Sequence, residues 1–526
     1  MLKNISLLII TLFILSCQNE TTLIDSTELP NEPNEIYETN FAGFITNEDR
    51  ELLADATIRV DNQSFTSQEN GLFHFENVLV KPRGKVLAIN KEGYLPLYKR
   101  VYNHRSNEAI TINAQMLESP APILLDGSLR TIDGNLSKLT IGEDVYDGNT
   151  SLTYYNHFDT EKSIDMDMMI EELAISMLDI EALWYIHADV AFSTGLPSYS
   201  YLPSTDSKVY YYDENELTWK EVTYNYTKVN GGVDILIDKY GWWAIAKKVP
   251  ANYGTIQLVQ KEEALIGKTE VVLEHHTSKQ QINEVFYTDS EGKISKFFPI
   301  ETYTSIYADN ENLVLGTADP VENNQALQVV KNNTEIINAV SGQTYDCNLN
   351  NASGWYAILT SKQQFLGEFK EGNFTSNVLA NEDSVEVVFY DDTFTELVDY
   401  TFLKEDVADK YPDFVLCENR LTVKDDGSTL GEFSDCTVRI KPNETIVVGD
   451  NGDIQSVFLM SFKGETPGLY EGLVFSNSSF GDDLGNEVDV EVKVFDELTN
   501  RVAGTIRGVK RGTQEPYDVL FIGNKE

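Results

Sequence analysis

Basic residues are scarce in this sequence of 526 residues. It holds 40 lysines and arginines against 84 aspartates and glutamates, which gives a formal net charge of −44. A nucleic-acid partner needs lysine and arginine to neutralise its phosphates, so this balance excludes nucleic acid and disfavours direct adhesion to anionic lipid. Such acidity commonly keeps a protein surface solvated. The alternative is dedicated calcium sites, for which residues 481–487 supply oxygen ligands but lack the EF-hand spacing.

The motifs of common enzymes are also lacking. None of the six histidines has glutamate three residues later, and neither the His-Glu-x-x-His spacing nor a nucleophile or phosphate-loop motif occurs. His275 and His276 are adjacent, so on a strand they would point to opposite faces and could not share a metal. Acidic residues stand at nearly every predicted strand end, so no carboxylate pair is singled out for glycoside hydrolysis. The sequence therefore predicts no catalytic residue, no metal, no cofactor and no enzyme.

Long segments with the 3.6-residue period of a helix are scarce, whereas tyrosine (27) and phenylalanine (25) are plentiful. The sequence therefore predicts an all-β fold, and its length allows about three to five domains. A strand is expected over 164–168, where apolar residues alternate with Asp165 and Asp167. One short helix is expected directly after it, because Ile170 to Leu178 are apolar at helical spacing.

The N-terminus carries the pattern of an export signal. A basic start at Lys3 precedes an apolar run from Ile5 to Leu15, which is too short to cross a bilayer but fits a signal peptide. The run ends in Ser16-Cys17 and resembles the bacterial lipobox, whose cysteine is lipidated. The resemblance implies that residues 1–17 form a lipoprotein signal peptide and that acylated Cys17 anchors the chain to a membrane. The alternative is an ordinary signal peptide that ends near a cysteine by chance.

Lipoproteins that stay at the inner membrane have aspartate directly after the lipidated cysteine, whereas this sequence has Gln18. By analogy, the chain is expected to be an outer-membrane lipoprotein of the cell envelope. It would lie on either the surface or the periplasmic face of that membrane. Residues 18–40 are polar and acidic, with Pro30 and Pro33. They cannot bury enough apolar surface to offset the entropy of ordering, which predicts a flexible tether.

Residues 43–94 carry the clearest strand pattern. Ile58 and Val60 alternate with polar residues, as do Phe73 and Phe75, at the period of a half-buried strand. Asn70-Gly71 predicts a hairpin, because both residue types tolerate positive φ. The whole pattern resembles the carboxypeptidase regulatory-like module, which is a transthyretin-type β-sandwich. Together with the lipobox, it makes the chain resemble exported bacterial lipoproteins of Bacteroidetes type that carry such modules. The resemblance implies such a sandwich over 41–118, without the catalytic domain of the peptidases.

The remaining regions are β-rich as well. A second sandwich is expected over 119–251, where the hairpin Tyr210-Tyr211-Tyr212…Trp219 and the strand at Trp242-Trp243 loosely resemble a unit that often follows the regulatory-like module. Residues 252–320 resemble a repeat of that module, with Gly292 answering Gly71; the alternative is an unrelated hairpin. Further β-rich domains are predicted over 321–408 and 409–526. The expected architecture is several immunoglobulin- or transthyretin-like β-sandwiches in tandem after the signal and tether.

Three cysteines remain once Cys17 is lipidated, and an exported protein meets an oxidising compartment. If Asp426-Gly427 forms a two-residue turn, counting outward places Cys417 opposite Cys436, within the reach of a disulfide. A β-bulge would shift that count. A Cys417–Cys436 disulfide is therefore predicted, with Cys347–Cys417, or no disulfide, as the alternatives.

These observations favour a non-catalytic, membrane-anchored lipoprotein that displays β-sandwich modules for binding another protein or an envelope component. The alternative is a glycan-binding accessory lipoprotein in polysaccharide uptake. That alternative needs exposed aromatic pairs, and Trp242-Trp243 could serve either as such a platform or as core packing. An enzyme has no motif in its favour.

Overall fold

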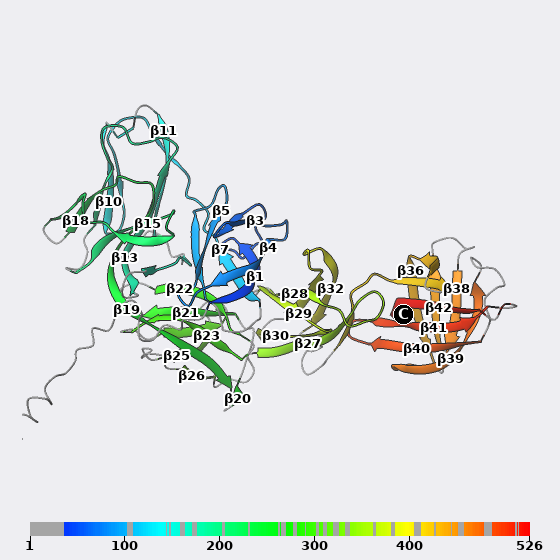
Figure 1. Cartoon of the computed structure of the whole chain (residues 1–526). Coiled ribbons are helices and arrows are strands. Elements are labelled where there is room, and N and C mark those ends of the chain that lie inside the picture. The colour runs from blue at the N-terminus through cyan, green and yellow to red at the C-terminus, as the bar shows by residue number, and fades with distance from the viewer. Residues whose placement is uncertain are drawn as a thin grey trace, which may run out of the picture.

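The described residues form strands and turns, and no helix occurs among them (Figure 1). The computed structural model describes residues 36–525, apart from 103–108, 144, 147–148, 158–163, 171–175, 202–205, 230–231, 261–262, 265–269, 277–280, 290, 301–303, 309–312, 319–325, 332–336, 361–363, 380–383, 404–411, 426–427, 443, 451–456, 478–486, 511–512 and 514. The predicted all-β fold class is confirmed.

Module 1 (residues 37–118) is a sandwich of two sheets. Its strands are β1 (Tyr37–Thr46), β2 (Thr57–Val60), β3 (Gln63–Thr66), β4 (Leu72–Val80), β5 (Lys85–Asn90), β6 (Leu97–Val101) and β7 (Ile110–Gln115). Strand β1 lies at the centre of one sheet, antiparallel to β4 and parallel to β7, and the other sheet has the order β3-β2-β5-β6. Phe41 and Ile45 from the first sheet meet Ile58 and Leu87 from the second in the core.

The same strand order occurs twice more. Module 2 has the sheets β23-β19-β26 and β22-β21-β24-β25, and module 3 has β30-β27-β33 and β29-β28-β31-β32. In each, the central strand is antiparallel to the fourth strand of the module and parallel to the seventh. The strands of module 2 are the second half of β19 (Gly241–Gln260), β21 (Glu270–His276), β22 (Gln281–Tyr287), β23 (Lys293–Pro299), β24 (Thr304–Ala308), β25 (Leu313–Ala318) and β26 (Ala326–Lys331), with β20 (Glu263–Ala264) beside β19.

The strands of module 3 are β27 (Ile337–Tyr345), β28 (Gly354–Leu359), β29 (Gln364–Phe369), β30 (Asn373–Leu379), β31 (Ser384–Tyr390), β32 (Glu396–Leu403) and β33 (Asp413–Val415). Because β26 and β33 complete their sheets, modules 2 and 3 both extend past the boundaries predicted at 320 and 408.

Three glycines occupy equivalent positions in the three modules. Gly71, Gly292 and Gly372 have φ of 70°, 75° and 81°, a conformation that glycine adopts without a steric cost. The carbonyl of each accepts a hydrogen bond from the central strand of its module, from the N–H of Ile45 (2.9 Å), Leu258 (2.9 Å) and Thr344 (2.7 Å) respectively. Gly71 and Gly292 therefore occupy equivalent positions, although not in the hairpins predicted for them, and Gly372 marks a third copy that was not predicted from the sequence.

The turn at Asn70-Gly71 is not the predicted hairpin. Strands β3 and β4 lie on either side of it, but β3 pairs with β2 and β4 pairs with β1, in different sheets. The turn therefore carries the chain from one sheet of the sandwich to the other. Positive φ at Gly71 serves this crossing as well as it would serve a hairpin, and for this reason the residue types alone did not distinguish the two.

Between modules 1 and 2 in the sequence, the strands from β8 to the first half of β19 form a second kind of sandwich, here called the aromatic sandwich. One sheet has the order β17-β18-β14-β10-β9, and the other runs β16-β15-β19-β13-β11-β8. Its strands are β8 (Ile123–Leu125), β9 (Arg130–Asp133), β10 (Ser137–Ile141), β11 (Thr150–Asn156), β12 (Met169–Ile170), β13 (Ser176–Ala188), β14 (Ser198–Tyr201), β15 (Lys208–Asp213), β16 (Thr218–Glu221), β17 (Tyr226–Val229), β18 (Gly232–Leu236) and the first half of β19.

The predicted helix over Ile170–Leu178 is wrong. Its ends lie in strands β12 and β13, which pair antiparallel, while residues 171–175 lie outside the described residues. Strand β13 is covered on both faces, so apolar residues follow one another in its sequence and a short window of it resembles an apolar helical face. Residues 164–168, predicted as a strand, are buried but form no strand.

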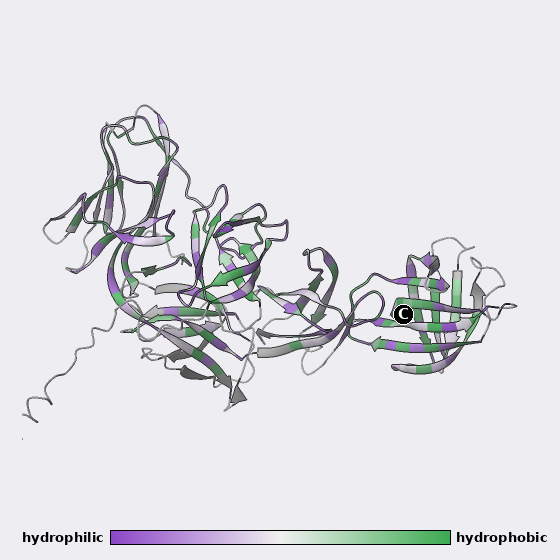
Figure 2. Ribbon diagram, in the orientation of Figure 1, coloured by the Kyte–Doolittle hydropathy of each residue, from purple (hydrophilic) through white to green (hydrophobic). Residues whose placement is uncertain are grey.

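The C-terminal domain is a sheet that closes on itself, at the far end of the molecule from the aromatic sandwich (Figure 1). Strand β42 pairs with β41 on one edge and with β34 and β36 on the other, and β36 to β41 pair in succession. Hydrophobic and hydrophilic residues alternate along its strands (Figure 2), which fills the interior with apolar side chains. The strands are β34 (Arg420–Asp425), β35 (Ser428–Phe433), β36 (Asp435–Lys441), β37 (Glu444–Asp450), β38 (Val457–Phe462), β39 (Gly468–Asn477), β40 (Glu487–Asp496), β41 (Arg501–Val509) and β42 (Pro516–Lys525).

Buried charges join module 1 to the aromatic sandwich. The Arg100 guanidinium donates to both carboxylate oxygens of Asp167, at 3.0 and 2.9 Å, and both side chains are at least 96% buried (4% and 2% exposed). Beside them Lys99 pairs with Asp165 and donates to the carbonyl of Val285 in module 2, at 3.0 Å. Burial raises the pKa of Asp165, and Lys99 opposes that rise. Three parts of the chain therefore meet at one buried set of charges.

A second buried network joins the three modules. Arg50 of module 1 forms an ion pair of 3.1 Å with Glu270 of module 2, which also accepts a hydrogen bond of 2.6 Å from Tyr287. The side chain of Gln364 of module 3 donates to the carbonyl of Arg50 at 2.9 Å, and the backbone carbonyl of Gln364 lies against the Tyr287 hydroxyl. On the neighbouring face Phe44 of module 1 packs in one apolar cluster with Trp355, Leu366 and Tyr390 of module 3. The modules therefore form a packed cluster.

Replacing Arg100 by leucine would leave Asp167 buried without its partner. We expect Arg100→Leu to lower the free energy of unfolding by about 3–5 kcal/mol, measured by urea denaturation. The matched control is Lys85→Leu, which removes the ion pair with Asp61, whose side chain is 54% exposed, and should cost no more than about 1 kcal/mol. Equal losses in the two variants would contradict the role given to the buried pair.

Candidate binding face on the C-terminal domain

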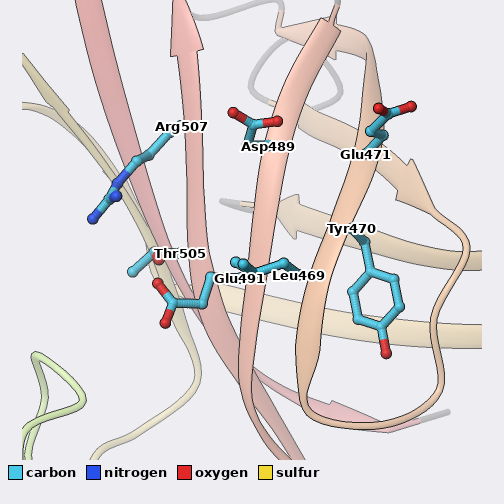
Figure 3. Close-up of a pocket in the computed structure, with 7 residues that line it drawn as sticks. All are labelled: Leu469, Tyr470, Glu471, Asp489, Glu491, Thr505 and Arg507. Atoms are coloured by element: carbon cyan, nitrogen blue, oxygen red, sulfur yellow. The ribbon is translucent and has the colours of Figure 1, made fainter.

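Three neighbouring strands, β39, β40 and β41, direct alternate side chains outward on the C-terminal domain (Figure 3). Their inward neighbours, among them Val474, Val490 and Ile506, lie in the apolar interior. The outward positions therefore are not needed to fill the core. They are Leu469, Glu471 and Leu473 on β39, Glu487, Asp489 and Glu491 on β40, and Thr505, Arg507 and Val509 on β41. We call these nine residues the binding face.

The strand register sets which of these side chains stand side by side. Glu471 lies opposite Asp489, and Asp489 lies opposite Arg507 on the next strand. In the adjacent row Leu469 lies opposite Glu491. Directly opposed carboxylates repel each other and destabilise a sheet, so the Glu471–Asp489 pair does not serve folding. Arg507 is also 3.6 Å from Asp518 on β42, so its charge is shared between acids on both sides.

Apolar side chains on this face are unusually exposed. Leu469 is 79% exposed, Leu473 is 47% exposed and Val509 is 43% exposed. Full burial of a leucine or valine side chain gives a favourable free energy of about 1.5–3 kcal/mol. In the isolated chain these three side chains gain little of that free energy, because they remain in water. The apolar residues stand among four carboxylates, so the face combines an apolar surface with negative charge.

The surface is hollowed along β39. A groove of about 1210 Å³ runs past Phe462, Leu469, Leu473 and Val509, and a smaller hollow of about 440 Å³ adjoins it at Glu491 and Thr505. Tyr470 lines both hollows; its hydroxyl donates to the carbonyl of Thr466 at 2.7 Å and its ring packs 5.5 Å from Phe462. The groove can therefore receive a ligand that has apolar groups and positive charge.

This face was not predicted from the sequence, although a pattern for it is present there. In the run Gly468-Leu469-Tyr470-Glu471-Gly472-Leu473-Val474, apolar residues occur at both parities of the strand. One parity fills the interior, so leucine at the other parity must lie either under another sheet or in the open. Which of these holds is decided by the tertiary structure.

Of the two roles considered for Trp242 and Trp243, core packing holds and the sugar platform is absent. Trp242 and Trp243 are 0% and 1% exposed and point to opposite faces of β19. Trp243 packs between the two sheets of the aromatic sandwich, against Trp184. Trp242 packs toward module 1, where its indole N–H donates to the carbonyl of Pro96 at 2.9 Å. Both rings are therefore core residues and neither can stack on a glycan.

The positions considered for lipidation and metal binding lie mostly outside the described residues. Cys17, and residues 481–486 of the acidic run considered for calcium, lie outside the described residues, as do the side chains of His275 and His276. Among the residues that the structure describes, no three histidine, cysteine, aspartate or glutamate side chains come together as a metal site. Within that same part of the chain no helix is long and apolar enough to span a membrane.

The disulfide predicted between Cys417 and Cys436 is wrong. Cys347 and Cys417 are joined, with 5.4 Å between their Cα atoms, and Cys436 is a buried free thiol. The expected pairing of Asp425 with Ser428 occurs, but a register shift follows between Val423 and Lys424. Cys417 moreover precedes strand β34, and Cys436 lies on β36, two strands away in the sequence. The bulge that could spoil the count is present.

The disulfide lies where module 3 meets the C-terminal domain. Leu349, from the loop that carries Cys347, packs with Cys417 against Val494, Ala503 and Ile522 of that domain. Arg420 donates to the carbonyl of Cys347 at 2.8 Å, and Arg501 donates to that of Cys417 at 3.1 Å. The cross-link therefore fastens the domain that bears the binding face to the cluster of modules.

No known protein-family model matches the sequence, and no curated protein is similar to it. Among solved structures, a protein of unknown function from Bacteroides fragilis is 11% identical, over 41% of this chain and 99% of that chain, with a TM-score of 0.14. The streptococcal ancillary pilin is 13% identical, over 41% and 93%, with a TM-score of 0.15. BcpA, the major pilin subunit of Bacillus cereus, is 9% identical, over 72% and 99%, with a TM-score of 0.14.

Removing the Cys347–Cys417 disulfide should lower the stability of the contact between module 3 and the C-terminal domain. A sequence separation of 70 residues corresponds to about 4 kcal/mol in the chain-entropy account of disulfides, so we expect Cys347→Ser to lower the free energy of unfolding by about that amount. Cys436 serves as the control: burial raises the pKa of its thiol to about 12, so it should react with alkylating reagents only after unfolding. A cross-linked peptide containing Cys436 in non-reducing peptide mapping would contradict the assignment.

Proposed function

We propose that this chain is a non-catalytic, lipid-anchored binding protein of the bacterial cell envelope, held at the outer membrane through Cys17 and engaging its partner through the binding face. The single observation that carries the binding role is the exposure of Leu469 and Leu473 beside a groove on an otherwise complete sheet. An exposed apolar surface rimmed by polar groups is typical of a site for another molecule.

The arrangement of the chain supports a display function. The tether was predicted over 18–40, but residues 37–40 already belong to β1, so only the residues before them would connect the anchor to module 1. The packed modules separate the C-terminal domain from the aromatic sandwich (Figure 1). The three modules share one two-sheet strand order, and the resemblance of residues 43–94 to the carboxypeptidase regulatory-like module supports reading them as sandwich modules for display. The sequence predicts no nucleophile, general base or metal ligand among the residues of the face, and the role proposed for it is binding without chemistry.

A protein partner is favoured over a glycan. The pair Trp242-Trp243, which the glycan-binding alternative requires, is buried in core packing. The exposed side chains of the binding face are mainly leucine, valine and carboxylates, and the ring of Tyr470, which lines both hollows, packs against Phe462. Aliphatic side chains of a polypeptide would fill the same groove and cover the exposed leucines.

The anchor is tested by Cys17→Ser. We expect this variant to leave the membrane fraction, because each buried acyl CH₂ group contributes about 0.8 kcal/mol to membrane binding and the variant carries no acyl chain. Ser16→Ala keeps a small residue before the cysteine and should stay with the membrane, as measured by fractionation and blotting. Retention of Cys17→Ser on membranes would contradict the proposal.

The binding face is tested by photo-cross-linking in cells. A photoreactive residue in place of Leu469 should form a discrete cross-linked product, because the face is covered by its partner. Leu124 of the aromatic sandwich is the matched control, since it is 78% exposed against 79% for Leu469. Products from position 124 but none from position 469 would place the partner elsewhere and reject this function for the face.

A further inference from the structure

We infer that the binding face takes an extended polypeptide segment in which aliphatic residues alternate with lysine or arginine along one face, that is, at every second position of the segment. This inference rests on the proposed function and names the class of partner. It concerns the nine outward residues of β39, β40 and β41, of which four are acids, one is a base and three are aliphatic.

Recognition at this face must use side chains. Strand β39 is hydrogen-bonded to β38 and β40, and β40 is hydrogen-bonded to β39 and β41. From Asp489 to Val492, β40 is paired with a strand on each edge, so a partner cannot add as a further strand at the centre of the binding face. The partner instead lies across the outer side of the sheet, where the groove is.

The spacing of the side chains matches an extended segment. Leu469, Glu471 and Leu473 alternate along β39, so the two leucines are about 13–14 Å apart with the carboxylate midway between them. An extended partner repeats its side chains on one face at the same interval. Two aliphatic residues four positions apart would meet Leu469 and Leu473, and a basic residue midway would meet Glu471 and Asp489, which are already side by side.

Charge selects the basic partner. A lysine or arginine placed between Glu471 and Asp489 would relieve the repulsion that these opposed carboxylates exert on each other. Lysine and arginine also lay their aliphatic stems on apolar surface while the charge stays in water, which suits a face that mixes leucine with carboxylates. A second copy of this chain, with its net charge of −44, and anionic lipid or polysaccharide would both be repelled.

The test uses the full chain and two fluorescent peptides of about ten residues. In one peptide leucine and lysine alternate at every second position with serine between them (Leu-Ser-Lys-Ser-Leu), so that both lie on the same face of the extended chain; in the other peptide glutamate replaces lysine. Fluorescence anisotropy should show binding of the lysine peptide, weakening as salt rises, and no binding of the glutamate peptide. The double variant Glu471→Gln, Asp489→Gln should weaken binding about tenfold, as should Leu469→Ser.

Asp234→Asn is the matched control. Asp234 is an exposed acid on β18 of the aromatic sandwich, two residues from the exposed Leu236, and its replacement should leave peptide affinity unchanged. Equal binding of the two peptides, or undiminished binding by the double variant, would overturn the inference. If position 469 cross-links in cells while the lysine peptide fails to bind, the face is a site and this partner class is wrong. If neither occurs, the proposed function fails as well.

Discussion

A charged side chain is stable inside a protein only when an opposite charge or several hydrogen bonds meet it. Arg100 and Asp167 satisfy this condition for each other, and Lys99 satisfies it for Asp165. Any shift of the aromatic sandwich along module 1 would separate these pairs and leave buried charges without partners. The pairs therefore fix one arrangement of the two parts. Strand β19 then carries this arrangement into module 2, because it runs without a break from the sheet of the aromatic sandwich into the central position of that module.

The same reasoning explains which parts of the fold could be predicted from the sequence. Strand period and turn residues are local, so the all-β class and the equivalence of Gly71 with Gly292 followed from short segments. The third copy carried the same local pattern, with Phe374 two residues after Gly372, as Phe73 follows Gly71. The segments between the central strand and the glycine differ in length among the copies, which obscured the repeat.

Features that depend on distant partners could not be predicted in this way. Asp165 and Asp167 alternate with apolar residues, but nothing local shows that they face Lys99 and Arg100 more than 60 residues earlier. The prediction of the disulfide was wrong for a related reason. The register was counted outward from the turn, and a bulge between Val423 and Lys424 shifts it. The binding face needed the tertiary structure too, because exposure of Leu469 is known only once every neighbouring strand is in place.

The central claim is that the outer side of β39, β40 and β41 is covered by a partner in the cell envelope. Hydroxyl-radical footprinting of intact cells, compared with the purified chain, tests it most directly. Leu469 and Leu124 are equally exposed in the isolated molecule, so their oxidation rates in the purified chain should be similar. The account predicts that Leu469 is protected in cells while Leu124 is not. Oxidation of Leu469 at the same rate in cells and in the purified chain would contradict it.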